Sequence, residues 1–510
     1  MPILSPKTTL NIIGAQEIQA AAAQRVLLVG QMLTGSAVAG VVSRDVSSSE
    51  TEINALFGAK SHIAELARKF KSVNKNTALD VLPIADNGAG VAASATLTFG
   101  GLATEDGSFD VYVMDKINYR ATISVIAGDD DDAVAAKVDA ALSALETKWP
   151  FSTTSATNVV TLTASNKGTI YNSAPVGVEG SVAGITYTLA AFASGATDPV
   201  LTGILAATGN MRYQTISWPA SYATTVLTTF LNARFNDEFE VLDGVGLTGK
   251  VDIFSNLSAG PSQNSQSLVV KVDNLLALDS RKGPACQTLI DSQIAIFAAV
   301  RSLRLTEDAS LSGIVTTVAA RDQFGGSGAS TLPYHNSILP GIAVPLPEDE
   351  FSLLQFQSLV EAGYSISSAN KAYNAVILGD AVTTYKTNGA GDPDTSFKYL
   401  NRVDSSSAIR EFFVNNYRAR YAQSRLTNGE IVAGRDMVNE GAIRAFSKRL
   451  YENLADDAIV EKGQVAAKDF NQNLLIEVSV SGGFIRVDMA PLQVGQVRTI
   501  LGTIAVKFSS

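Results

Sequence analysis

The chain has 510 residues, of which 46% are hydrophobic and 17% are charged. These proportions exclude a disordered, collagen-like or coiled-coil chain, because each of those classes requires a very different composition. At about 150 residues per domain, the length predicts about three domains with a substantial buried core.

Membrane insertion and soft-metal chemistry are also excluded by the composition. The longest uninterrupted apolar stretch is Ile294–Val300, far short of the ~20 residues that span a bilayer, and the N-terminus lacks a signal pattern. We therefore expect a soluble protein that starts in a cytoplasm. A single cysteine, Cys286, and two histidines, His62 and His335, provide neither an internal disulfide nor a zinc ligand set. We expect no cofactor and no metal.

The charge is distributed unevenly along the chain. The net charge is −10, which disfavours long-range attraction to nucleic acid or anionic lipid. Residues 86–200 carry 13 acids and 5 bases, whereas residues 401–510 carry 12 acids and 14 bases. We expect the acidic block to face solvent and the C-terminal part to face a surface that tolerates cations.

The first 86 residues predict an arm followed by part of a core domain. Residues 1–20 have no strong helical period and form the predicted N-terminal arm. Residues 21–86 form the first part of the core domain, with strand, helix, helix and strand in that order. The strands are 25–30 and 79–84; the first helix follows the cap at Ser47–Glu50 and the second spans 62–70.

Residues 87–199 differ in composition from the preceding segment and are rich in Thr, Ser, Gly and Val. Their residues alternate with a period of two, as in β-strands. Segments 109–114 and 119–125 predict a hairpin, and a helix with an apolar stripe runs from Asp129 to Leu145. Glycine and serine lie near both ends of the segment. The pattern predicts an inserted β-rich outer domain that folds independently.

Residues 200–340 predict a middle α/β domain, with a helix at 225–234 and a strand at 267–272. Four prolines between 333 and 347 mark its boundary, because proline interrupts continuous elements.

Residues 341–496 predict a C-terminal core domain, and residues 497–510 predict a C-terminal arm strand. Helices and strands are mixed without a regular βαβ repeat, so the predicted class is α+β and multidomain. The expected helices are 350–362, 405–426 and 439–459, and the expected strands are 375–377, 382–385, 474–480 and 484–488.

The segment Gly244–Lys250 matches a phosphate-binding loop at six of seven positions. Val251 stands where Mg²⁺ binding requires Ser or Thr, and the following residues read as a strand rather than a helix. A glycine-rich turn is the favoured interpretation, and nucleotide binding is the alternative.

Two further groups could carry chemistry. Asp129–Asp132 could bind Ca²⁺, but the EF-hand spacing is absent and helix capping accounts for four acids at a helix start. A serine hydrolase would need His62 or His335 beside a nucleophile, and no Gly-x-Ser-x-Gly elbow is present. No catalytic residue is predicted.

The first long C-terminal helix, 405–426, has Arg410, Arg418 and Arg425 nearly aligned, with Glu411 as its only internal acid. This face either contacts solvent or docks on an acidic partner.

The second long helix, 439–459, carries Arg444, Lys448 and Arg449 beside its apolar stripe. Glu440 and Glu452 lie four residues from Arg444 and Lys448, so ion pairs within the helix compete with partner contacts.

The last predicted strand, 497–508, has one apolar face, which as a free edge would promote aggregation. It either sits centrally in its own sheet or pairs with another chain. The apolar face consists of Ile500, Ile504, Val506 and Phe508.

Short colinear segments along most of the chain resemble one known family. They resemble the tail sheath proteins of contractile-tailed bacteriophages, the Mu-like branch in particular, although residues 1–20 lack the family's Arg-Val-Pro-Gly type segment. In the C-terminal part the segments are 339–345, Phe351, Leu353–Leu354, 361–363, 376–385, Asn388, 392–401, 471–479 and 486–488; upstream they are 25–31, 56–58, 159–164 and 166–168.

This resemblance implies a structural subunit, not an enzyme, of a contractile phage tail sheath. The subunits would stack as a six-start helix around the tail tube and contract to drive the tube through the host envelope. A core domain built from N- and C-terminal segments would face the tube, inserted domains would project outward, and terminal arms would add strands to neighbouring subunits. The alternatives are the sheath of a phage-derived bacteriocin or of a contractile secretion or injection machine and, remotely, a nucleotide-hydrolysing enzyme.

The resemblance also implies partners and a tube-facing surface. The partners would be other copies of the chain, the tail tube protein, and baseplate and tail terminator proteins, without nucleic acid or membrane insertion. The protein would assemble in the host bacterial cytoplasm and reside in the virion. The C-terminal core helix would contact the tube through Arg444, Lys448 and Arg449, with Arg418 and Arg425 as a second choice.

Overall fold

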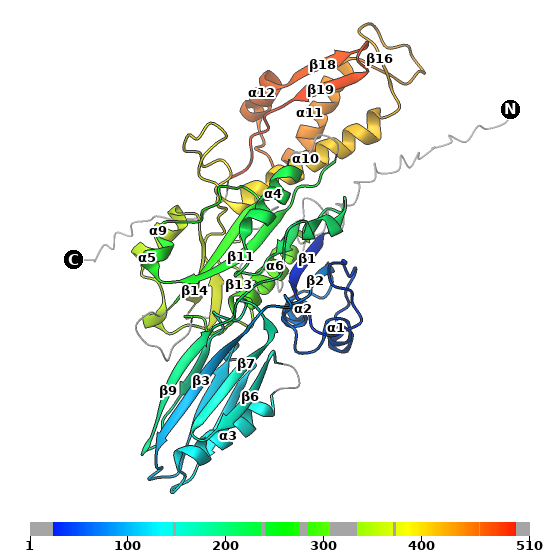
Figure 1. Cartoon of the computed structure of the whole chain (residues 1–510). Helices are drawn as coiled ribbons and strands as arrows, with labels where there is room; N and C mark the ends of the chain where they lie inside the picture. The colour runs from blue at the N-terminus through cyan, green and yellow to red at the C-terminus, as the bar shows by residue number, and fades with distance from the viewer. Residues whose placement is uncertain are drawn as a thin grey trace, which may run out of the picture.

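A computed structural model describes residues 24–145, 149–235, 240–275, 284–306, 334–370, 374–457 and 459–495. These residues form three units in a row (Figure 1). A central unit holds an eight-stranded sheet, a β-rich insert projects from one end, and a unit of helices with a hairpin lies at the other. The predicted arms 1–20 and 497–510 lie outside the described residues.

The central sheet has the strand order β13-β15-β14-β12-β11-β10-β1-β2. The six strands from β14 to β2 pair in parallel, and β15 and β13 continue the sheet antiparallel. The strands are β1 (Arg25–Gln31), β2 (Ala78–Ile84), β10 (Thr215–Ser217), β11 (Val245–Asp252), β12 (Leu268–Asn274), β13 (Ile338–Leu339), β14 (Ser365–Asn370) and β15 (Ala375–Leu378).

Helices cover both faces of this sheet, which explains why its strands are apolar on both sides. One core contains Val26 and Leu28 of β1 with residues of α1, α2 and α6; the other contains Leu27 and Val29 with residues of α4, α5 and α9. The predicted serine cap is Ser49, whose side chain accepts from the amide of Glu52. The helices are α1 (Glu50–Phe57), α2 (His62–Val73), α4 (Thr224–Arg234), α5 (Phe254–Leu257), α6 (Ile290–Thr306) and α9 (Leu353–Glu361), with 3₁₀ turns η1 (Ile204–Thr208) and η2 (Pro347–Asp349).

The sheet crosses the boundaries that the sequence predicts between the core and middle domains. Strands from 21–86, from 200–340 and from the first part of 341–496 hydrogen-bond to one another in a single sheet. Parallel neighbours require long crossovers, so strands distant in sequence become adjacent in space. The segment 200–340 therefore does not stand apart as a middle domain.

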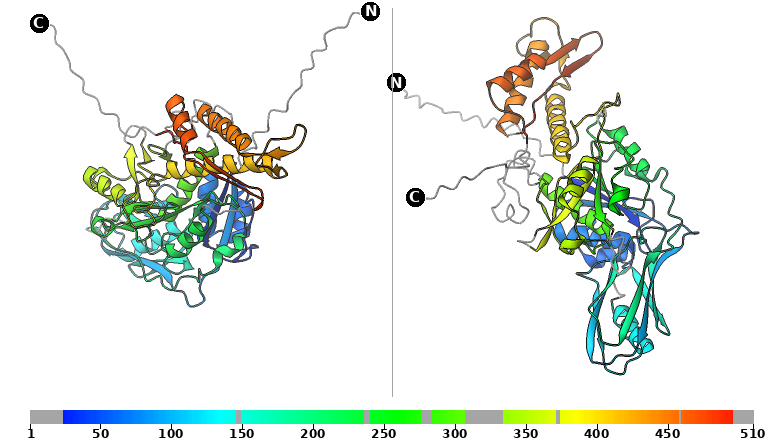
Figure 2. Two further views of the ribbon diagram at one scale, coloured as in Figure 1. Left: turned by 90° about the horizontal axis from the view of Figure 1, so that it is seen from above. Right: turned by 90° about the vertical axis from the view of Figure 1, so that its left-hand side faces the viewer.

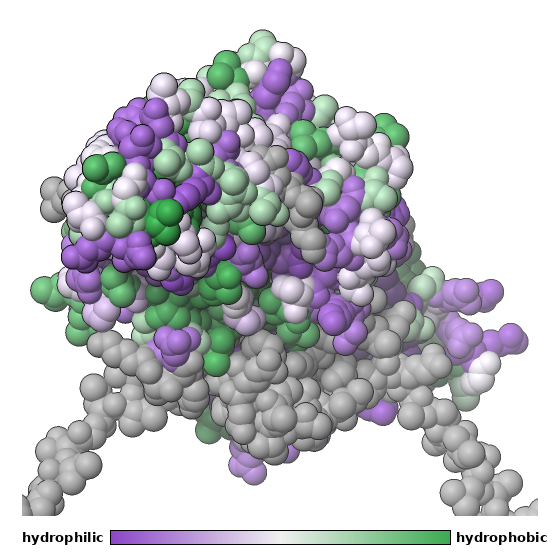
Figure 3. Space-filling model, turned by 90° about the horizontal axis from the view of Figure 1, so that it is seen from below, coloured by the Kyte–Doolittle hydropathy of each residue, from purple (hydrophilic) through white to green (hydrophobic). Residues whose placement is uncertain are grey.

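The insert contains two antiparallel sheets with a common apolar core. The predicted hairpin is present as β4 and β5, and α3 packs one face against strands of both sheets, namely β3, β5, β6 and β7. Seen from this end of the molecule, hydrophilic and hydrophobic residues are interspersed (Figure 3). The elements are β3 (Ala92–Gly101), β4 (Gly107–Val113), β5 (Arg120–Val125), α3 (Asp131–Ser143), β6 (Phe151–Ala156), β7 (Val159–Lys167), β8 (Val176–Glu179) and β9 (Ile185–Ala193).

The C-terminal unit is joined to the central unit by one long helix, α10 (Leu400–Tyr421) (Figures 1 and 2). Leu400 and Val403 at its start belong to the central core, whereas Ile409 and Phe413 belong to the core of the C-terminal unit. The other elements are β16 (Arg425–Leu426), β17 (Met437–Val438), α11 (Glu440–Asp456), α12 (Gln464–Asn473), β18 (Leu475–Ser479) and β19 (Phe484–Asp488).

The α+β, multidomain class is confirmed, with three local differences. Helix α10 ends at Tyr421, so Arg425 lies in β16 rather than on the helix. Residues 382–385 form no regular strand, since Val382 makes only an isolated bridge to Tyr399. Helix α12 is an additional element that the sequence interpretation omitted. Among the described residues, no helix combines the length and apolarity needed to cross a membrane.

Candidate functional site

The candidate phosphate loop is a buried strand. Residues 245–252 form β11, which pairs in parallel with β10 on one side and β12 on the other. A Cβ atom at Gly246 would overlap Leu227 of α4, and one at Gly249 would overlap Ile290 of α6. The glycines thus allow helices to pack closely on both faces, which corrects both the turn and the phosphate-binding interpretations.

The histidines and the cysteine hold structural positions. His62 is fully buried, and its Nε2 lies 2.9 Å from Oδ2 of Asp291, while Nδ1 of His335 lies 3.5 Å from a carboxylate oxygen of Asp380. Burial raises the pKa of the Cys286 thiol, which disfavours a reactive thiolate. His62 and Cys286 are enclosed by packing, whereas the side chain of His335 is 33% exposed beside Asp380.

The four consecutive acids form a helix cap, as the favoured interpretation states. The side chain of Asp130 accepts a hydrogen bond from the amide of Ala133, and Asp129 forms an ion pair with Lys137. Within the described ranges, no group of three or more His, Cys, Asp or Glu residues is placed to hold a metal ion.

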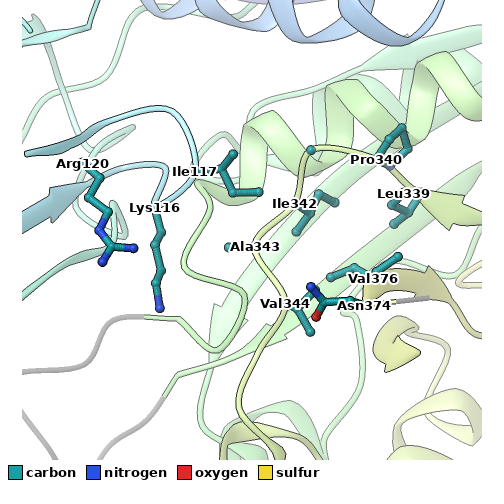
Figure 4. Close-up of a pocket in the computed structure, with 12 residues that line it drawn as sticks. Lys116, Ile117, Arg120, Leu339, Pro340, Ile342, Ala343, Val344, Asn374 and Val376 are labelled. Carbon is teal, nitrogen blue, oxygen red and sulfur yellow. The ribbon is translucent and has the colours of Figure 1, made fainter. Parts of the chain in front are cut away.

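One pocket of about 500 Å³ lies between the insert and the central unit (Figure 4). Lys116 and Arg120 line it from the insert, opposite the apolar segment Leu339–Val344. Both cations already pair with Glu179, and Arg120 also pairs with Asp110. The pocket therefore has an apolar wall and a neutralised polar wall, without a set of groups that could perform acid–base or nucleophilic chemistry.

Of the predicted tube-facing residues on α11, Arg444 is held by the fold. Its guanidinium donates to the carbonyl oxygen of Leu474 at 2.9 Å and pairs with Glu440 at 3.0 Å, as the four-residue spacing predicts. Lys448 is half-buried and Arg449 is exposed. No ion pair links Lys448 to Glu452 in the described part of the chain, so Lys448 and Arg449 are the cations that α11 presents outward.

The three arginines that the sequence aligns on one face of the first long C-terminal helix, Arg410, Arg418 and Arg425, have different environments in the structure. Arg410 pairs with Asp243 at 2.6 Å, and its neighbour Glu411 pairs with Arg212 at 2.6 Å, so these two helix residues hold α10 on the central unit. Arg418 is exposed on the helix, whereas Arg425 is exposed in β16. The sequence interpretation missed these contacts because the partners lie 167 and 199 positions away.

The β18–β19 hairpin is a two-stranded sheet whose outer edges carry no strand among the described residues. Leu475 is 63% exposed and Phe484 is 48% exposed on its outward face. Two strands alone are marginally stable in water, and unpaired edges invite another strand. The predicted intersubunit strand residues Ile500, Ile504, Val506 and Phe508 lie outside the described residues.

Comparison with known proteins finds similarity along most of the chain. No protein-family model matches the chain. Two solved structures are similar over most of their length: a sheath tail protein from Desulfitobacterium hafniense (11% identity, TM-score 0.45, 93% of this chain and 98% of that one) and the contracted helical sheath of the anti-feeding prophage (11%, 0.46, 95% and 94%). The Mu-like prophage FluMu tail sheath protein of Haemophilus influenzae is 24% identical over 467 residues, or 89% of this chain and 87% of the relative. The resemblance to Mu-like tail sheath proteins that the sequence predicts is thus confirmed, as similarity to such a protein over most of the chain.

Proposed function

We propose that the chain is the structural subunit of a contractile phage tail sheath, which polymerises helically around a tail tube and shortens to drive that tube through the host envelope. One observation carries this proposal: the match to a Mu-like tail sheath protein covers 89% of this chain and 87% of that protein. The subunit would act in the virion, after assembly in the host bacterial cytoplasm.

The proposed role is mechanical rather than catalytic. The one nucleotide-binding candidate, 244–250, supplies a buried strand to the central sheet, and its glycines contact helices rather than a ligand. A sheath subunit needs no cofactor, since contraction can draw on the difference in packing between two arrangements of the same subunits.

Copies of the chain would join by strand addition at the β18–β19 hairpin. The inward residues Ile476 and Val487 of this hairpin are only half-buried, and both outer edges are open in the described structure. An added strand would form hydrogen bonds with the backbone amides and carbonyls at the edge of the hairpin, and its apolar side chains would further bury Ile476 and Val487. The sequence predicts a strand with one apolar face for the C-terminal arm, 497–510, which is the proposed donor to a neighbouring subunit.

The tube contact is proposed to lie on α11, at Lys448 and Arg449. A sheath must hold its tube before contraction and slide along it afterwards. Exposed charge pairs suit this requirement because each contributes only ~0.2–1 kcal/mol, while their number grows with the length of the tail. Arg418 and Arg425 form the second candidate patch, and the acidic insert, 87–199, would project away from the tube as an outer domain.

Negative-stain electron microscopy of the purified chain tests the proposal. We expect hollow tubes or stacked rings at high protein concentration, or when the tail tube protein is supplied as a template. Particles that stay monomeric under both conditions would contradict the sheath role. A bacteriocin or injection machine would use the same subunit, and the presence or absence of a DNA-filled head on native particles separates these alternatives.

A further inference from the structure

The junction between the insert and the central unit is unusually polar for a buried surface. The sequence predicts an insert that folds independently, which would place exposed, weakly interacting residues at the boundary. Instead, α2 of the central unit buries two charged side chains against the insert: Glu65 is 2% exposed and Lys69 is 8% exposed.

Each of these charges takes a partner from the turn between β4 and β5. Lys69 forms an ion pair with Asp115, which is fully buried, and Oε2 of Glu65 accepts a hydrogen bond from the hydroxyl of Tyr119 at 2.8 Å. Burial and the nearby Glu65 carboxylate raise the pKa of Tyr119, which keeps its hydroxyl protonated as the donor. Within α2, Glu65 also pairs with Arg68 at 2.8 Å and lies 3.9 Å from Nζ of Lys69, so Lys69 is the charge whose close partner, Asp115, comes from the insert.

A second set of contacts joins the insert to the end of β1 and the start of α2. Asn166 of β7 accepts a hydrogen bond from the amide of His62 at 2.8 Å and donates one to the carbonyl of Met32 at 3.1 Å. Gln31, at the end of β1, donates to the backbone carbonyl of Lys167 at 2.8 Å. The amide at the first residue of α2 thus has its hydrogen-bond partner in the insert.

The segment before α6 makes the third contact. The amide of Leu289 donates to the carbonyl of Met114 at 2.8 Å, and the amide of Lys116 donates to the carbonyl of Gln287 at 3.1 Å. Leu289 is fully buried within the apolar core of the insert, although it belongs to the central unit by sequence. The central unit therefore contributes a side chain to the apolar core of the insert, in addition to the polar contacts.

We infer that the insert and the central unit fold as one cooperative body, in which the Lys69–Asp115 pair and Asn166 make α2 dependent on the insert. A buried charge that loses its partner is strongly destabilising, since it keeps the cost of desolvation without the compensating attraction. Detaching the insert would leave Lys69, Glu65 and the amide of His62 without these partners and would expose Leu289. The central unit thus requires the insert for its stability, and the insert cannot be removed without loss of the folded subunit.

Hydrogen exchange of the full-length monomer tests this inference with the variant Asp115→Asn. The substitution keeps the size of the side chain and removes the charge that pairs with Lys69. We expect amide exchange to accelerate on the order of 100-fold in both α2 and the insert strands β4 and β5, because one opening event exposes both. The matched control is Asp110→Asn, which removes the charge from an outer ion pair on β4 and should accelerate exchange only locally.

Acceleration confined to the insert, with α2 exchanging at the wild-type rate, would overturn the inference. A second measurement removes residues 87–199 and replaces them with a short glycine linker. We expect this variant to be insoluble or to lose its cooperative thermal transition. A soluble deletion variant with a sharp transition at the wild-type temperature would show that the insert and the central unit fold independently.

Discussion

The guanidinium of Arg444 on α11 donates a hydrogen bond to the carbonyl oxygen of Leu474, 2.9 Å away, immediately before β18 begins. This contact connects the helix with the proposed tube-facing surface to the hairpin with the proposed subunit-linking edges. It also separates the three cations of α11 into one that holds the fold and two, Lys448 and Arg449, that are available to a partner.

The first prediction concerns those two cations. The variant Lys448→Glu/Arg449→Glu should assemble poorly on tail tubes, because reversed charges repel an acidic contact surface. Its thermal midpoint as a monomer should stay close to wild type, since neither residue has an ion-pair partner among the described residues. Sedimentation of sheath with tubes at low salt, where charge effects are least screened, measures assembly.

Arg444→Glu is the matched control for that experiment. It should destabilise the monomer by about 1.5–3 kcal/mol, because a hydrogen bond from a charged group to Leu474 is lost. Normal assembly of the Lys448/Arg449 variant at low salt would assign the tube contact to another surface, with Arg418 and Arg425 tested next.

The second prediction concerns the C-terminal arm. Deletion of residues 497–510 should leave a soluble monomer that does not polymerise, because the hairpin edge of each neighbour loses its proposed added strand. Electron microscopy and light scattering at matched concentration would check this. Single substitutions Lys507→Ala and Ser510→Ala serve as controls, since they leave the residues of the predicted apolar face, Ile500, Ile504, Val506 and Phe508, unchanged. Wild-type polymers from the truncated chain would remove the arm from the assembly mechanism.

The third prediction tests the structural role of the glycine-rich strand. Gly249→Ala should destabilise the protein by about 1–3 kcal/mol, since the added methyl group overlaps Ile290 at the start of α6. Gly389→Ala is the control, because its added Cβ meets nothing within 4 Å and its φ is not positive. Urea unfolding of both variants measures the difference. Equal stability of the two would mean that α6 does not pack on β11 as described.

The fourth prediction concerns the attachment of α10 to the central unit. Arg301 and Asp404 form an ion pair in which both side chains are buried, and Tyr334 donates its hydroxyl hydrogen to Asp404 at 2.6 Å. Asp404→Ala should reduce the free energy of unfolding by about 3–5 kcal/mol, because Arg301 keeps its buried charge without a carboxylate. Arg402→Ala, at an exposed position of the same helix, should change it by less than about 1 kcal/mol. A small effect at Asp404 would argue against the buried pair.

The fifth prediction is a dependence on pH. Hydrogen bonds from Arg120 and Thr122 lower the pKa of Asp110 from its ordinary value. Because the pKa of Asp110 is lower in the folded state than in the unfolded state, ionised Asp110 stabilises the folded protein at pH values above its unfolded pKa of about 3.9. This contribution is lost as the pH falls through the pKa that Asp110 has in the folded state. Asp110→Asn should therefore cost about 0.2–1 kcal/mol at pH 7 and progressively less below pH ~4. Urea unfolding across this range, with Ser108→Ala as an uncharged control on the same strand, would detect the difference; a constant cost down to pH 3 would contradict the assignment.

The sequence by itself determined the features that arise from neighbouring residues. The strand at β1, the cap at Ser49, the acids that start α3 and the pair Glu440–Arg444 each depend on residues a few positions apart. Period and capping chemistry are local, so they can be read directly from the chain. The order of short segments along the chain also indicated the tail sheath family.

The tertiary structure decided which distant segments meet. Six parallel strands form one sheet because their crossovers bring 21–86, 200–340 and the start of 341–496 together, and no local pattern encodes that order. The same holds for Arg410 with Asp243 and for Lys69 with Asp115, whose partners lie on other elements. From sequence alone, a charged residue on a helix is expected to face solvent, and only the tertiary structure shows whether a distant carboxylate pairs with it. Where the pair is buried, loss of the carboxylate is strongly destabilising.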